Sequence, residues 1–336
     1  MVEGAHGPMA RLSAVIIAGC LAAALVATVV RSETASWMPH RNVEFIVPTA
    51  AGSTMDVLAR AIEKIWESQH AVNTSMTVEA KSGASGAVAW TYVSRQAGDG
   101  HYLAISGPTL LSNEILGVGE LKYTDVTPIA QLFTEYTVFA VRADGPIKSG
   151  ADLVVAMRSS NALSVGVAPG FGGSNHVAVL KLARAANVDP ATLAIAPFRG
   201  ANESITALLG GHIDMADATL SAIEPFLESG KLRAVAVAAP QRLSGPQSSI
   251  PTWREQGFDV VEGNWRGIVG PRNLGSAELA YWDERVAALV KSPAWADVLK
   301  QYYWDADYAD SAGSRRFLDA QYQELRTTFA NLHLAK

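Results

Sequence analysis

Short apolar runs of strand length alternate with helical patterns along most of this sequence. This alternation predicts a largely parallel sheet covered by helices, because each parallel strand pair needs a crossover connection. The runs typical of strands are 43–47, 74–79, 101–106, 136–141, 163–168, 193–198, 213–216, 232–239 and 265–269. The helical patterns are 55–65, 87–96, 149–157, 175–186, 203–209 and 223–229, followed by a mostly helical stretch over 276–336. We therefore expect an α/β fold.

The length of the chain, 336 residues, exceeds what one ordinary hydrophobic core supports and suits two domains. Residues 141–254 contain a complete alternating unit, flanked by a first unit and by the helical tail. No linker rich in Pro, Gly or Ser separates independent modules. We therefore expect one lobe from 40–140 together with 255–336, and a second lobe from 141–254, with two chain crossings between them.

The N-terminus has the pattern of an export signal. Arg11 precedes an uncharged, largely apolar run over 12–30. That run is also long enough to span a bilayer, so residues 1–36 are expected to be a signal peptide or an N-terminal anchor. Met9 is an alternative start to Met1. Cys20 follows Ile-Ala-Gly as in a lipoprotein box, but the apolar run continues beyond it, which favours an unmodified residue. We expect a periplasmic protein.

The composition and motifs exclude several classes of protein. Net charge is -5, with scattered Lys and Arg, which argues against a nucleic-acid partner. The sequence has no Gly-x-Ser-x-Gly, His-Glu-x-x-His or P-loop lysine, no dinucleotide fingerprint, and no paired histidine spacing for a metal. We therefore expect no catalytic residue, no cofactor and no metal. A hydrolase using Ser174 and His176 is a remote alternative, because neighbouring side chains at a helix start point in different directions.

Two loops, 48–56 and 169–176, share one physical plan. Each follows a strand, contains small residues that let a ligand approach the backbone, and begins a helix whose free N–H groups favour an anion. Helix capping by Ser, Thr or Asp would produce the same pattern. Asp56 is expected to cap its helix more readily than to bind a ligand, and His176 could equally be structural. The candidate ligand-binding residues are Ala51, Gly52, Ser53, Thr54, Asp56, Gly172, Gly173, Ser174, Asn175 and His176.

Two charged residues near strand ends are further candidates. Arg199 follows a strand and could pair with a distal carboxylate, or it could form a surface salt bridge. Asp217 lies near the C-terminal end of a short strand, where it could face a ligand or serve as a turn residue.

These loops belong to a series of short motifs that resembles the periplasmic solute receptors of tripartite tricarboxylate transporters, the Bug family. The resemblance runs from about Val43 to the C-terminus. Its motifs include Ile46-Val47-Pro48, Ala51-Gly52, Asp56-Val57-Leu58-Ala59-Arg60, Ser82-Gly83-Ala84-Ser85-Gly86, Asp99-Gly100-His101-Tyr102-Leu103, Gly172-Gly173-Ser174-Asn175-His176, Pro197-Phe198-Arg199-Gly200, Leu209-Gly210-Gly211-His212-Ile213-Asp214, Gly230-Lys231-Leu232-Arg233-Ala234-Val235, Ile250-Pro251-Thr252 and Trp265-Arg266-Gly267.

The resemblance implies a two-lobed periplasmic binding protein of type II, a Venus flytrap with a cleft between its lobes. It implies that the two loops hold a ligand carboxylate, partly through backbone and water, and it adds Thr109 as a candidate. It also implies delivery of the ligand to integral-membrane permease subunits, with the receptor expected to be a monomer. A sensor that presents its closed form to a membrane signalling protein would use the same state, so that alternative stays open.

The chain departs from the usual family pattern at several positions. Ser53 and Ser85 stand where the family usually has glycine, Gly98 replaces a proline, and Phe198-Arg199-Gly200 replaces Tyr-Lys-Gly. Arginine offers a planar fork of donors where lysine offers a point charge. These departures leave the expected fold intact and make the identity of the carboxylate ligand open.

Overall fold

The computed structural model describes residue 1 and residues 37–159, 163–168, 170–331 and 334. The expected export segment, apart from Met1 itself, lies outside the described residues, and so does Pro169 in the second loop. Residues Met38–Lys336 form one compact unit. Within the described ranges, no helix is both long enough and apolar enough to cross a bilayer.

A sheet of ten strands forms the centre of this unit, in the order β2-β1-β3-β9-β4-β7-β5-β6, with β8 and β10 also paired to β4. The strands are β1 (Val43–Val47), β2 (Met76–Ala80), β3 (Tyr102–Ser106), β4 (Val126–Arg142), β5 (Ser164–Val167), β6 (Ala194–Pro197), β7 (Met215–Thr219), β8 (Leu232–Val237), β9 (Gly263–Pro271) and β10 (Asp305–Ala309).

The long strand β4 divides the sheet into two halves. From Val126 to Tyr136 it pairs with β9, and from Thr137 onward it pairs with β7 and β8. We call the half with β1, β2 and β3 lobe I, and the half with β5, β6, β7 and β8 lobe II. The expected parallel pairing holds within β1–β3 and within β5–β7. It is wrong for β4 and β9, which run antiparallel to their neighbours.

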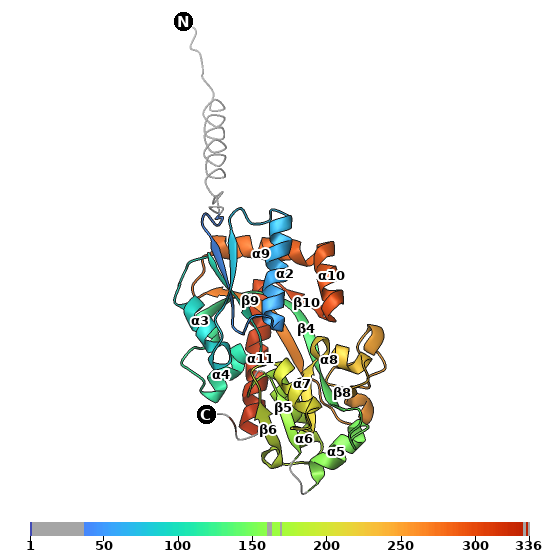
Figure 1. Ribbon diagram of the computed structural model, residues 1–336. Helices are drawn as coiled ribbons and strands as arrows, with labels where there is room; N and C mark the ends of the chain where they lie inside the picture. The colour runs from blue at the N-terminus through green and yellow to red at the C-terminus, as the bar shows by residue number, and fades with distance from the viewer. Residues whose placement is uncertain (2–36, 160–162, 169, 332–333, 335–336) are drawn as a thin grey trace. The chain divides into compact units, whose positions relative to one another are not determined.

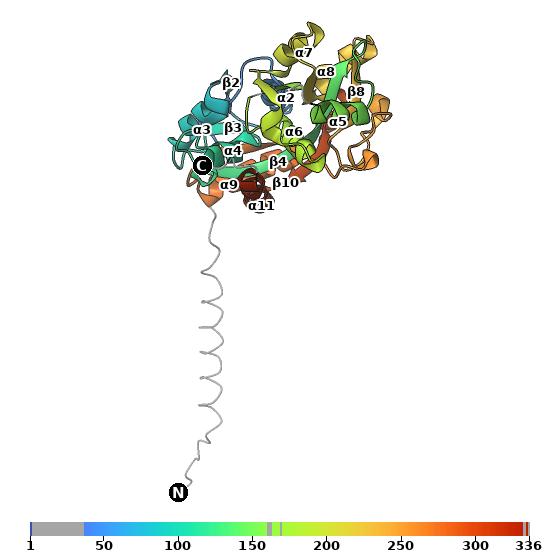
Figure 2. The same cartoon turned by 90° about the horizontal axis from the view of Figure 1, so that it is seen from below.

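Ten helices within the described ranges cover the two halves. They are α2 (Thr54–Ser68), α3 (Ala87–Ser94), α4 (Thr109–Leu116), α5 (Gly150–Arg158), α6 (Ser174–Ala185), α7 (Ala201–Leu209), α8 (Leu220–Glu228), α9 (Ser276–Val290), α10 (Pro293–Tyr302) and α11 (Ser311–Asn331). Helices α3 and α4 lie on one side of the unit and α5 and α8 on the opposite side (Figures 1 and 2). These four helices therefore divide between the lobes as the sheet does.

One apolar cluster includes helices of both lobes. Leu111 and Ile115 of α4 and Trp265 of β9 belong to it, together with residues of α11 and with Val177 of α6. Val177 is fully buried although it belongs to lobe II. The start of α6 is therefore packed against lobe I, which places the loop before α6 beside α4.

Candidate ligand-binding site

The first helix start is built around Gly52 and Ser53. Gly52 has φ +77°, a conformation that glycine adopts without strain. Ser53 is extended (φ −74°, ψ 165°) and accepts a hydrogen bond from the backbone N–H of Asp56 at 3.3 Å. The Ser53 hydroxyl also lies 2.6 Å from the Thr49 hydroxyl. Ser53 thus caps α2, and glycine, usual here in the family, would lack this hydroxyl.

The second helix start has the same backbone conformation. Gly172 has φ +82°, and Gly173 has φ −74° and ψ 165°, the same pair of angles as Ser53. The Gly52 N–H donates to Asp56 Oδ2 at 2.9 Å, and the Gly172 N–H donates to His176 Nδ1 at 3.1 Å. In each loop, the side chain four residues after the glycine with positive φ accepts a hydrogen bond from the backbone N–H of that glycine. The shared sequence plan therefore corresponds to a shared geometry.

Asp56 and His176 hold the backbone of their own loops in this arrangement. Asp56 Oδ2 also accepts from Arg60 at 3.1 Å. Burial lowers the pKa of His176 to about 4, so its ring is neutral at physiological pH and Nδ1 can accept a hydrogen bond. The N–H groups of residues 54–55 and 174–176 precede the first intrahelical hydrogen bond of each helix, and such groups suit an anion.

Ser174 is bonded to β9 and not to His176. Its hydroxyl donates to Gly263 O at 3.2 Å and lies 3.4 Å from Asn264 Oδ1. Because His176 Nδ1 already accepts from Gly172, this geometry does not support an activated serine nucleophile. In the described part of the chain, no group of three or more His, Cys, Asp or Glu side chains is placed to hold a metal ion.

Asp217 lies inside lobe II beneath the start of α6. It is fully buried, and its Oδ2 accepts from the Thr137 hydroxyl at 3.1 Å. The Asn175 side chain donates to the Asp217 backbone carbonyl at 2.7 Å. Burial raises the pKa of Asp217 well above its usual range. Asp217 therefore supports the α6 loop from behind.

The second loop touches lobe I directly. A Cβ on Gly172 would lie 2.6 Å from Leu116 Cδ1 and 2.9 Å from Ser112 Oγ, both on α4. A Cβ on Gly170 would lie 4.0 Å from the Ser85 hydroxyl. The structure thus brings the α6 loop against lobe I.

The remaining candidates differ in their surroundings. Thr109 is buried as the first residue of α4, directly after the N-cap residue Pro108. Ala51 and Gly52 are exposed, and Ser53 and Thr54 are half-buried. Arg199 is exposed before α7, where its backbone N–H donates to Glu203 at 3.1 Å.

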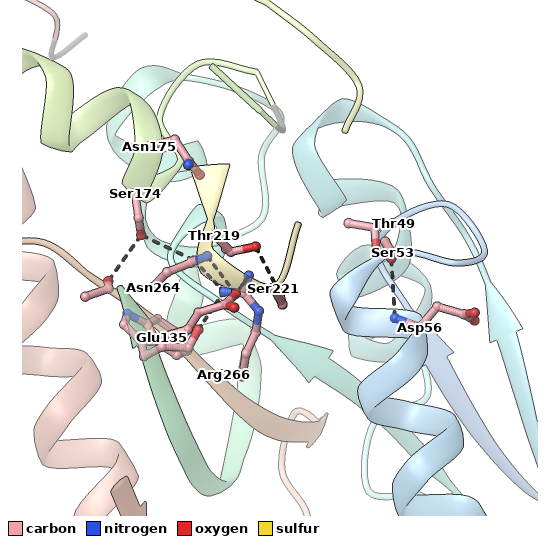
Figure 3. Close-up of polar contacts among 12 residues, drawn as sticks. Thr49, Ser53, Asp56, Glu135, Ser174, Asn175, Thr219, Ser221, Asn264 and Arg266 are labelled. Atoms are coloured by element: carbon pink, nitrogen blue, oxygen red, sulfur yellow. Dashed lines mark hydrogen bonds and ion pairs between the residues drawn. The ribbon is translucent and has the colours of Figure 1, made fainter. Parts of the chain in front are cut away.

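Sequence reasoning missed several polar residues near these loops. Thr219 occupies the N-cap position of α8 directly after β7 without a side-chain capping bond, and its hydroxyl lies 3.3 Å from that of Ser221. Because β7 runs directly into α8 with no Gly-rich loop between them, the strand–loop–helix plan does not single it out. Glu135 of β4 and Arg266 of β9 form a buried ion pair at 3.0 Å. Arg266 lies in the motif Trp265-Arg266-Gly267, but nothing in the local sequence indicates its pairing with Glu135. Figure 3 shows these groups and the contacts that run from Ser174 to Arg266.

A strained turn adjoins the α6 loop. Residues 83–86 all have positive φ, including Ala84 at 44° and Ser85 at 50°. Asn113 fixes the turn by donating from Nδ2 to the carbonyls of Ala84 (3.3 Å) and Ser85 (3.2 Å). This conformation explains why glycine suits position 85.

Ser85→Gly is expected to stabilise the protein by up to about 1 kcal/mol, because glycine removes the left-handed strain at some cost in chain entropy. Urea unfolding would measure the gain. Ala87→Gly, at a helical φ of −57° in α3, is the control and should destabilise by about 1 kcal/mol. If Ser85→Gly and Ala87→Gly lower the free energy of unfolding equally, the backbone at Ser85 is not strained.

Residues 58–333 match the family described as "Tripartite tricarboxylate transporter family receptor". A TctC solute-binding protein from Polaromonas, solved without ligand, is 26% identical, with a TM-score of 0.68 over 87% of this chain and 99% of that one.

Two further solved structures contain carboxylates. A protein of R. palustris with adipate is 24% identical, with a TM-score of 0.80 over 88% of this chain and 99% of that one. MatC from Rhodopseudomonas palustris with bound malate is 24% identical, with a TM-score of 0.76 over 87% and 99%. These likenesses confirm the predicted two-lobed fold of periplasmic binding proteins. The chain belongs to the tripartite tricarboxylate transporter receptor family, and it is a solute-binding receptor and not an enzyme.

Proposed function

We propose that this receptor is exported to the periplasm, captures a small mono- or dicarboxylate between its lobes, and delivers it to the integral-membrane subunits of a tripartite tricarboxylate-type transporter. The observation that carries the proposal is the matched pair of helix starts at Ser53 and Gly173, with the same φ and ψ. One such start comes from each lobe, and the loop of one lobe touches the other.

The chemistry of the two starts suits a carboxylate. The first intrahelical bonds are donated by Val57 and Val177, so the N–H groups of residues 54–55 and 174–176 precede them. These groups and the positive ends of the helix dipoles favour an anion. Hydroxyls of Ser53 and Thr54 lie at the first start. The adipate and malate bound by the two related structures are both dicarboxylates.

The lobes would close on the ligand by a hinge at the two chain crossings. We propose that residues 40–140 with 255–336 move as one body and residues 141–254 as the other. Support comes from β4, which changes partners between Tyr136 and Thr137, and from β9, whose first residue pairs with Tyr136. Strands that belong to both halves are suited to absorb a small rotation.

Thermal unfolding against a panel of acids tests the proposal. Adipate, malate, glutamate and benzoate would be compared with neutral sugars at the same concentration. A ligand at 100 times its Kd should stabilise the folded state by about 2.7 kcal/mol. We expect at least one carboxylate to raise the Tm and the sugars to leave it unchanged. Stabilisation by another ligand class alone would overturn the carboxylate assignment.

A further inference from the structure

The two strands that cross between the lobes share a buried ion pair. Glu135 of β4 and Arg266 of β9 are 3% and 6% exposed, and Arg266 Nη2 lies 3.0 Å from Glu135 Oε1. Glu135 is the residue next to Tyr136, where β4 changes partners, and it stands opposite Asn264 of β9. The ion pair therefore lies where the chain crosses between the lobes, so a change in the angle between the lobes would change its geometry.

Asn264 connects this pair to the α6 loop. Its Nδ2 donates to Glu135 Oε1 at 3.0 Å, and its Oδ1 accepts from Arg266 Nη1. The same Oδ1 lies 3.4 Å from the hydroxyl of Ser174, the first residue of α6, whose single O–H is shared between this oxygen and Gly263 O at 3.2 Å. Both ends of the Asn264 amide are thus fixed by charged partners, which leaves its oxygen facing Ser174 (Figure 3).

Arg266 also reaches the loops of lobe I. A Cβ on Gly107 would lie 3.3 Å from Arg266 Nη1 and 2.7 Å from Met55 Cε, so these groups crowd the backbone between β3 and α4. Met55 belongs to the first turn of α2. One guanidinium therefore adjoins the helix starts of lobe I and, through Asn264, the helix start of lobe II.

The donors of Arg266 are not all satisfied in this arrangement. Three of its five N–H groups bond to Asn264, Trp265 O and Glu135. Among the described residues, none accepts a hydrogen bond from its buried Nε. A buried charge with an unsatisfied donor lowers the free energy of unfolding. Well-packed apolar residues would give a more stable fold at this site, so stability alone does not account for the ion pair.

We propose that Arg266 and Glu135 are positioning residues that hold the α6 loop against lobe I through Asn264 and Ser174. They set the equilibrium between closed and open lobes. The proposal rests on the two-lobed fold and not on the ligand proposed above, so it can be tested without ligand.

Spin labels on the exposed Val88 of α3 and Val155 of α5 would report the distance between lobes in the ligand-free full chain. The labelled cysteines are introduced in a Cys20→Ser background, since Cys20 is the one native cysteine. The test variant is Glu135→Leu with Arg266→Met, which removes both charges and leaves neither buried alone. Arg242→Lys, in an exposed pair with Glu255, is the control.

We expect the double variant to shift the distance distribution toward longer values, and the control to match the parent. Ser174→Ala should produce a shift in the same direction, and combining it with the double variant should give less than the sum of the two shifts. Both variants break the contact of Ser174 with Asn264, while Ser174→Ala alone also removes the bond to Gly263 O. Ser174→Ala keeps the charges of Glu135 and Arg266. It therefore replaces the double variant as the test if the double variant fails to fold. Distributions unchanged by either variant, or fully additive shifts, would overturn the proposal.

Discussion

Gly172→Ala is expected to weaken carboxylate binding about 30-fold or more. Alanine at φ +82° carries a backbone penalty of about 1–2 kcal/mol. Its Cβ would also press on Leu116 and Ser112 of α4, and both contacts join the α6 loop to lobe I. The substitution therefore acts on the arrangement in which the lobes meet. Each 1.4 kcal/mol lost there is tenfold in affinity.

Calorimetric titration with the carboxylate that gives the largest thermal shift would measure this loss. Gly200→Ala is a matched control, because Gly200 also precedes a helix of lobe II. Gly200 is extended, at φ −162°, and a Cβ there meets nothing within 4 Å. We expect its affinity to equal that of the parent protein. A Gly172→Ala variant that binds as tightly as Gly200→Ala would show that the α6 loop does not close on the ligand in this way.

The strand–loop–helix plan of the two loops could be predicted because it depends on residues that are close together in the sequence. Glycine followed four residues later by an acceptor occurs at Gly52 with Asp56 and at Gly172 with His176. The sequence interpretation left Asp56 and His176 between capping, structural and ligand roles. The contacts show both fixing their own loops, which a search for the glycine-to-acceptor spacing could have suggested.

The antiparallel crossing strands could not be predicted by the same means. The first part of β4 contains Pro128, Gln131 and Glu135, which interrupt the apolar run that signals a buried strand. β10 is acidic and mostly exposed, so no apolar run distinguishes it from the helical pattern expected over 276–336. Glu135 and Arg266 are 131 residues apart, and only the register of β4 against β9 brings them together. Long-range register has no local signature.

Glu262→Gln is expected to flatten the pH dependence of stability. Glu262 precedes β9, is buried, and lies 2.7 Å from Lys181 of α6. Burial raises its pKa from 4.5 to about 7, despite the attraction of Lys181. The folded protein then binds a proton more readily than the unfolded chain between these values. Its free energy of unfolding falls as pH rises from about 4.5 to 7 and levels off above.

A pKa difference of one unit corresponds to about 1.4 kcal/mol. The rise in the pKa of Glu262 from 4.5 to about 7 therefore lowers the free energy of unfolding by about 3 kcal/mol once the pH exceeds 7. Glutamine cannot ionise, so Glu262→Gln should match the parent near pH 5 and exceed its stability at pH 8, as measured by urea unfolding at each pH. Asp217 contributes a slope of the same sign, of which the variant removes only the part caused by the charge of Glu262, a smaller cause than burial. Glu324→Gln, at the exposed carboxyl that also pairs with Lys181, should change stability by less than about 1 kcal/mol. If Glu262→Gln is the less stable protein at pH 8, the attraction to Lys181 outweighs the burial of the carboxylate, and the pKa of Glu262 is not raised.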